Sequence, residues 1–200
     1  MTSTDKQKRY RDRANRNWRA LHKEQEQFGA ISDGGGKRYL AGIYYVLAGE
    51  TEKSSTYFTW FESEFPDDVG EPLFLLCWAI AVHESGTVED ARYRFHLAML
   101  SNLYLIPHLI GEPIEEINMW HSSNRDCAEY LFEVEEWLSD IPPEVIPWLK
   151  AEYGMKGAAQ LRWEYVKTYH ALQSEKEVSE RRRLLQSWYE YAEQRVGKNG

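Results

Sequence analysis

The sequence lacks several features that would point to particular functions. It has only two cysteines, Cys77 and Cys127, in 200 residues, which is too few for a disulfide framework or a cysteine-based zinc site. No apolar run approaches the ~18 to 20 residues of a membrane span, and the charged N-terminal region lacks the apolar core of a signal peptide. We therefore expect a cytoplasmic protein that makes no membrane contact.

Positive charge is scarce in the middle of the chain. The net charge is −8, but residues 1–28 carry +4, residues 29–155 carry −15 and residues 156–200 carry +3. An acidic region of this size repels a phosphate backbone, so nucleic acid is disfavoured as a ligand of the central region. Only the ends of the chain could attract it.

Glycine is concentrated in one place that divides the chain. Residues 3–28 form one long polar pattern with a thin apolar stripe of helical spacing, which predicts a basic N-terminal helical arm over residues 1–28. The three consecutive glycines that follow have high backbone freedom and break the helix, so residues 29–38 are predicted to be a linker. Residues 39–200 then form the main helical domain.

The main domain begins with two similar helix pairs. Apolar residues at helical spacing predict helices before Gly49, up to Pro66, before Gly86 and through Met99. Gly86 lies 37 residues after Gly49, and Phe95 lies 37 after Phe58. A period of this size is typical of stacked two-helix repeats. Further helical patterns follow, and no segment alternates with period two, so the predicted fold is all-α, built of stacked antiparallel helix pairs.

A short apolar segment with two prolines and a glycine, SNLYLIPHLIGEP, follows the second pair. Together with the residues up to Leu149, it resembles the tail of certain tetratricopeptide-like proteins, in which a repeat helix runs into an Asn, a Pro-containing apolar hook and a Gly, and then into helices with Trp and Pro. The matching residues are Ala91, Phe95, Ala98, Asn102, Pro107, Gly111, Ala128, Tyr130, Trp137, Pro143, Trp148 and Leu149. The resemblance implies a helical-repeat fold and an interaction role. Asn102, Pro107, Gly111, Trp137 and Trp148 are expected to be structural, and the hook is expected to be a joint that also covers an open end of the stack.

Four features suggest chemistry but fit other interpretations better. The segment DGGGKR lacks the hydroxyl residue and the preceding strand of a phosphate-binding loop. His83, His96, His108 and His121 do not share a helical face, so we expect packed or surface histidines rather than metal ligands. Cys77 lies in the most apolar predicted helix, where burial suppresses thiolate reactivity, and Cys127 has no adjacent base in the sequence. The paired carboxylates are expected to form solvated helix faces. We therefore predict no catalytic residues, cofactor or metal, although bound metal in purified protein would indicate an undetected hydrolase or metal enzyme.

The basic N-terminal helix is the most distinctive charged feature. Arg9, Arg13 and Arg16 are spaced i, i+4 and i+7 and share one side of a helix, where they could bind phosphates or an acidic partner. Alternatively, the helix docks on the acidic region of the same chain.

The sequence favours a non-enzymatic adaptor that binds a protein or peptide. Tyr44, Trp60, Trp78 and Trp120 are the aromatic candidates for a partner-binding groove, because exposed aromatic side chains give large contact area at low entropic cost. An acidic groove predicts a basic partner. A nucleic-acid-associated protein that binds through the N-terminal helix is the alternative, and the oligomeric state stays open.

Overall fold

The computed structural model describes residues 3–119 and 127–196, which form ten α-helices, one short 3-10 helix and no strand. The helices are α1 (Ser3–Phe28), α2 (Lys37–Leu47), α3 (Thr51–Glu64), α4 (Pro72–Ser85), α5 (Val88–Ser101), α6 (Leu105–Ile110), α7 (Tyr130–Leu138), α8 (Ile146–Gly154), α9 (Lys156–Ser174) and α10 (Val178–Val196), with η2 (Pro143–Val145) before α8. The predicted all-α fold is confirmed. None of the helices in these ranges is long and apolar enough to cross a membrane.

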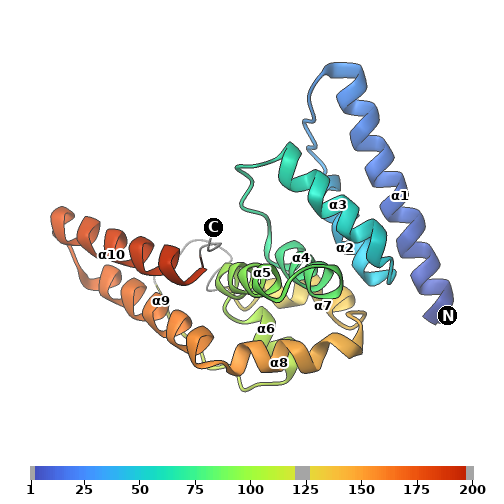
Figure 1. Ribbon diagram of the computed structural model, residues 1–200. Helices are drawn as coiled ribbons and strands as arrows, with labels where there is room; N and C mark the ends of the chain where they lie inside the picture. Colours follow the sequence, from blue (N-terminus) through green and yellow to red (C-terminus); the bar gives the residue numbers. More distant parts are fainter. Residues whose placement is uncertain (1–2, 120–126, 197–200) are drawn as a thin grey trace.

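The helices follow one another in an open arc (Figure 1). α1 packs along α2 at one end, α4 and α5 pack against each other in the middle, and the α9–α10 hairpin lies at the other end. Both bounds of α5 lie 37 residues after those of α3, so the repeat offset in the sequence corresponds to two packed helix pairs, α2 with α3 and α4 with α5.

α4 forms the centre of the core. Its sequence is apolar on every side, and α2, α3 and α5 all pack against it. Its N-terminus is capped by the Glu71 carboxylate, which accepts hydrogen bonds from the Phe74 and Leu73 amides. The Tyr130 hydroxyl donates to the same carboxylate and links α7 to α4. Burial raises the pKa of Glu71, so this cap is tightly enclosed.

The proline-containing hook is buried in the fold. The Asn102 side chain ends α5 and caps α6, since its Oδ1 accepts from the amides of Tyr104 and Leu105, both at 3.0 Å. Pro107 lies in the first turn of α6, where a missing N–H costs no helical bond. Gly111 ends the helix at φ +74°, a conformation that glycine adopts without strain.

The hook has a different position from the expected one. Leu103, Leu105, Ile106 and Ile110 are buried, but α8 packs against α6 on the side away from α5. The chain therefore continues past the hook with α8, α9 and α10. The hook is a buried joint, as expected, but it does not close an end of the stack, because the later apolar segments supply further helices that pack on it.

The two tryptophans with expected structural roles join separate helices. Trp137 on α7 contacts Tyr44 on α2 edge to face, with ring centroids 6.4 Å apart. Trp148 on α8 stacks on His83 of α4 at 4.1 Å and 5°. Both rings are only partly buried. They pack against the outside of the core and attach α7 and α8 to it.

Candidate functional site

Two of the aromatic residues predicted to face a partner lie in the core. Tyr44 is 8% exposed and Trp78 is 6% exposed. Tyr44 stacks on Tyr10 at 5.6 Å, and Trp78 stacks on Phe58 at 5.3 Å. The expectation that they offer exposed contact area is wrong, because α1 covers Tyr44 and α3 and α5 enclose Trp78.

The other two aromatic candidates have different outcomes. Trp60 is half-buried on α3, where its ring contacts Trp18, His22, Tyr57 and Phe65. It belongs to an aromatic cluster that joins α1 to α3. Trp120 lies outside the described residues.

A groove between α3 and the α4–α5 pair is the best-formed candidate binding site. It is a cavity of about 200 Å³, with Phe58 and Trp78 at its base and Ser55, Thr59, Glu62, Ala81, Val82, Ser85, Gly86, Asp90 and Arg94 around it. Its volume is below the range typical of small-molecule pockets and suits a single side chain. It opens between two helix pairs, at a place where neighbouring repeats meet.

The electrostatics of this groove depend on one buried cation. The Arg94 side chain is 9% exposed, its guanidinium lies 3.5 Å from the centroid of the Trp78 ring, and its Nη2 donates to Glu62 Oε1 at 2.6 Å. The negative charge of Glu62 balances the positive charge of Arg94. The carboxylate of Asp90 also lines the groove, so the groove has a net formal charge of one negative unit. The Asp90 amide donates a hydrogen bond to the Thr87 hydroxyl. The groove therefore combines an aromatic base with an acidic rim.

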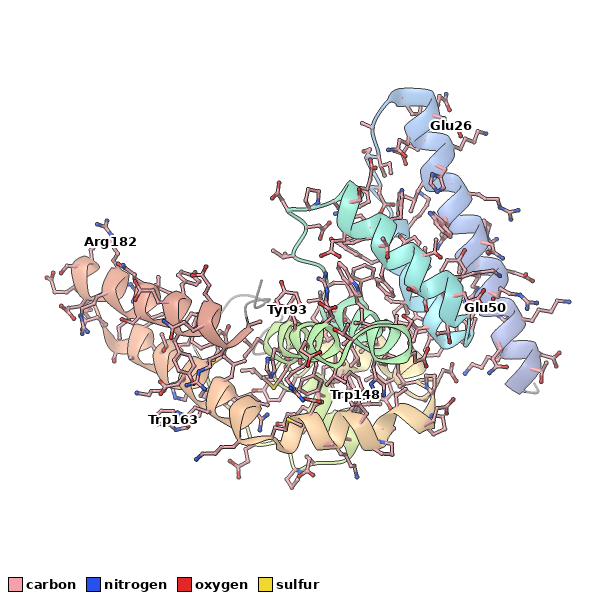
Figure 2. All side chains as sticks on the ribbon, viewed as in Figure 1. Glu26, Glu50, Tyr93, Trp148, Trp163 and Arg182 are labelled. Atoms are coloured by element: carbon pink, nitrogen blue, oxygen red, sulfur yellow. The ribbon has the colours of Figure 1, made fainter. Side chains whose placement is uncertain are left out.

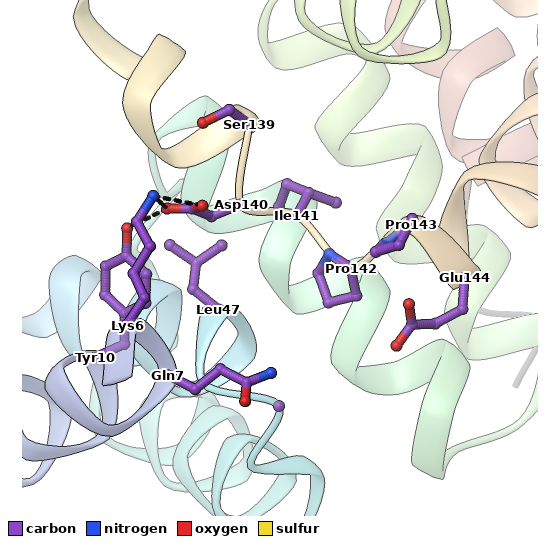
Figure 3. Close-up of a pocket in the computed structure, with 11 residues that line it drawn as sticks. Lys6, Gln7, Tyr10, Leu47, Ser139, Asp140, Ile141, Pro142, Pro143 and Glu144 are labelled. Atoms are coloured by element: carbon purple, nitrogen blue, oxygen red, sulfur yellow. Dashed lines mark hydrogen bonds and ion pairs between the residues drawn. The ribbon is translucent and has the colours of Figure 1, made fainter. Parts of the chain in front are cut away.

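A second cavity lies where the N-terminal helix meets the loop after α7 (Figure 3). It measures about 370 Å³. Lys6 Nζ donates to Asp140 Oδ1 at 2.6 Å, and the Tyr10 hydroxyl donates to Asp140 Oδ2 at 2.5 Å. Burial and the neighbouring Asp140 charge raise the pKa of Tyr10, so this phenol is a hydrogen-bond donor at every physiological pH. The contacts join α1 to the body.

The three arginines predicted as a basic face have different environments. Arg13 is half-buried and lies 5.8 Å from the centre of the Tyr44 ring. Arg9 and Arg16 are exposed on the outer side of α1. Lys6 and Arg11 pair with Asp140 and Glu50 of the body, so α1 directs part of its charge inward and keeps part of it in solvent.

The glycine-rich segment forms a helix cap. Asp33, buried at φ +39°, accepts hydrogen bonds from the amides of Lys37 and Arg38, both at 2.8 Å. These amides begin α2, and they are the groups that would hold a phosphate. A carboxylate of the protein occupies that position, which supports the rejection of a phosphate loop.

The histidines and cysteines have separate surroundings. His83 stacks on Trp148, His108 contacts Glu135, and burial lowers the pKa of His96 to about 4; His121 lies outside the described residues. Burial raises the pKa of the Cys77 thiol, and Cys127 is half-exposed. In residues 3–119 and 127–196, no group of three or more potential ligands is arranged to hold a metal ion.

The sequence did contain a signal for Arg94. It lies three residues after Ala91 and four before Ala98, both fully buried, so a charge falls on the core-facing side of α5. Its partner Glu62 is 32 residues away on another helix, and no local pattern connects the two.

Comparisons with protein-family models, with curated proteins and with solved structures find no match for this chain.

Proposed function

We propose that this chain is a non-enzymatic, cytoplasmic protein-binding module of the tetratricopeptide-like type, and that the α3–α4–α5 groove binds a basic side chain of a partner protein or peptide. The observation that carries the proposal is the combination of aromatic base and acidic rim around Arg94. A long basic side chain can place its aliphatic stem against the apolar lining that includes Val82 and its charged head at the acidic rim.

The charge of the whole central region supports a basic partner. Residues 29–155 carry −15, and Glu62 at the rim is half exposed to solvent. A cationic peptide would be drawn toward this region at long range, and the groove would then select one side chain at short range. Such binding weakens as salt increases but retains an apolar component.

The experiment is a fluorescence-anisotropy titration of the full chain with a labelled Lys/Arg-rich peptide and with the same peptide carrying Glu at every basic position. We expect only the basic peptide to bind. Glu62→Gln should weaken its binding roughly tenfold, because one charge contact at the rim is lost while the amide can still accept from Arg94. Thr59→Trp, an exposed position beside the cavity, should block binding sterically.

The control is Glu133→Gln, an exposed carboxylate on α7 outside this groove. It makes the same change in net charge as Glu62→Gln. Equal weakening by both variants would mean that only the overall charge attracts the peptide. Undiminished binding to Thr59→Trp would place the peptide elsewhere on the molecule.

A nucleic-acid role through α1 is the second candidate, favoured by the exposed outer face that carries Arg9, Arg16 and Arg19. Deleting residues 1–28 is a poor test, because Tyr10, Ala14 and Leu21 are buried core residues. The double variant Arg16→Glu with Arg19→Glu leaves that core intact. If α1 binds nucleic acid, this variant should weaken binding of a labelled oligonucleotide and reduce the salt dependence of the binding that remains.

A further inference from the structure

The last helix has an apolar stripe that no described residue covers. Val178 is 70% exposed and Tyr189 is 61% exposed, and the half-buried Leu185 lies between them at helical spacing. The three side chains line a shallow depression of about 550 Å³, and α10 alone supplies its walls. Isolated exposed apolar residues are ordinary, but several that line one depression along a single helix face indicate a contact surface.

The apolar side chains of Val178 and Tyr189 take no part in two contacts that hold α10 to α9, although Arg181, which also lines the depression, makes one of them. α10 packs on α9 through Trp188, whose ring lies 5.0 Å from that of Tyr165. Arg181 ties the start of α10 to the end of α9, because Nη1 donates to the backbone oxygens of Leu172 and Glu175. Neither contact uses the side chains of Val178 or Tyr189. α10 is thus anchored on one side and open on another.

The charges beside the stripe are ordered along the helix axis. Arg182 lies near the N-terminal end, and Glu190 and Glu193 lie near the C-terminal end, all three exposed on the same face. Figure 2 shows Arg182 at the outer end of the hairpin. The sign of the charge therefore changes from positive to negative along the face. When a second copy of α10 packs antiparallel to the first, each positive end lies opposite a negative end.

We propose that this face is a self-association surface, on which the α10 helices of two copies of this chain pack antiparallel about a two-fold axis. Such an interface is isologous, so every contact occurs twice. A partner of one charge sign would meet a repulsive half of the face, whereas a second copy meets opposite charges at both ends.

The spacing along α10 defines the register. When two identical antiparallel helices cross near Gln186, Arg182 of one lies opposite Glu190 of the other. Arg182 is then also near Tyr189 of the second copy, where a guanidinium can pack on the phenol ring. Leu185 falls beside the axis and packs against its own counterpart. The apolar stripe is covered along its centre, and the ion pairs flank it.

The size of the face predicts a weak dimer. One pair of helices buries less area than a standard specific interface. We therefore expect reversible association at micromolar concentrations, and a monomer in dilute solution.

Sedimentation velocity of the full chain, over a range from low to high micromolar concentration, tests the proposal. We expect a monomer–dimer equilibrium. Arg182→Glu and Glu190→Arg should each weaken dimerisation at least about tenfold, since each places two like-charge pairs in the interface. The double variant with both changes should restore the dimer, because the exchanged charges again meet their opposites.

The matched control is Arg183→Glu, which makes the same charge change on the same helix. Arg183 pairs with Glu180 and does not line the stripe. The Arg183→Glu variant should therefore dimerise with the same dissociation constant as the parent chain. Circular dichroism checks that each variant keeps its helical content. A chain that stays monomeric at every concentration would overturn the proposal, as would a dimer that Arg182→Glu leaves unchanged. Failure of the double variant to recover would overturn the antiparallel register.

Discussion

The first and last helices are both long and highly charged, but they differ in how they are covered. α1 buries Tyr10, Ala14 and Leu21 against the body and forms ion pairs with Asp140 and Glu50. Among described residues, α10 buries only Trp188 and Val196 and exposes part of its apolar surface. The more polar of the two helices is thus integral to the core, whereas the less polar one presents an open face.

The difference should also appear in local stability. α1 is held by apolar contacts with α2 and by charged contacts with the body, whereas most contacts of α10 are with α9. Elements with fewer buried contacts open more easily. We expect the α9–α10 hairpin to exchange amide hydrogens faster than α1.

The largest expected effect is the difference in unfolding free energy between truncating a buried residue of α1 and truncating a half-exposed residue of α10. Leu21 is 0% exposed, so Leu21→Ala should lower the free energy of unfolding by about 2 to 5 kcal/mol. Leu185→Ala, at a half-exposed position of α10, should cost less than about 1 kcal/mol. Urea unfolding at a concentration where the chain is monomeric measures both. Similar losses would remove the distinction between the helices.

The next effect depends on pH and concerns the base of the C-terminal hairpin. Burial lowers the pKa of His96 from 6.5 to about 4, and its charged neighbours are Glu152, Arg92 and Arg162. The unfolded chain therefore binds a proton at His96 below about pH 6.5, whereas the folded chain binds it only near pH 4. Stability should be complete above pH 6.5 and fall as pH decreases to about 4, by up to roughly 3 kcal/mol.

Unfolding measured at several pH values tests this effect. His96→Gln should flatten the pH dependence in that window, because it removes the buried imidazole. Hydrogen exchange at pH 5 should show the loosening in α9, where Arg162 lies, and not in α1. An unchanged pH profile in His96→Gln would show that another group controls acid sensitivity.

A smaller effect concerns the contact between α1 and the loop after α7. Asp140→Ala removes the partner of both Lys6 and Tyr10, so we expect a loss of about 1 to 2 kcal/mol in unfolding free energy. Lys6→Met keeps the Tyr10 hydrogen bond and should cost less than half as much. Faster exchange confined to the first turns of α1 would localise the change. Equal costs for the two variants would assign the whole effect to the ion pair.

The smallest expected effect is at the surface pair of Arg11 and Glu50. Arg11 is 42% exposed, so solvent screens the charge, and Arg11→Ala should cost less than about 1 kcal/mol. The cost should decrease further when unfolding is repeated at high salt. A large loss independent of salt would mean that the aliphatic part of Arg11 contributes packing to α1.

Local patterns were sufficient for most of the helices. The predicted helix over residues 3–28 matches α1, and the breaks at Gly49, Pro66 and Gly86 fall between observed helices. Glycine and proline act on the backbone within a few residues, so their effect can be read without knowledge of the fold. Asn102 and Gly111 have roles of this kind, as a helix cap and a helix end.

The candidate site was less predictable because its members come from different helices. Nothing in the local sequence indicates that neighbouring helices cover Tyr44 and Trp78, since an aromatic residue on a helix has the same local pattern whether or not another helix packs on it. The pairing of Arg94 with Glu62 brings together α5 and α3. The hook was expected at an end of the stack, but its position depended on where α8 packed.

What the sequence determined by itself was the helical class, the approximate bounds of most helices and the sign of charge in each part of the chain, because backbone preferences and charge are local properties. Only the tertiary structure decided which helix faces would be buried. The core-facing side of α1, the Arg94 groove and the uncovered stripe of α10 all follow from which neighbour packs where. That packing minimises exposed apolar area over the whole molecule rather than within one segment.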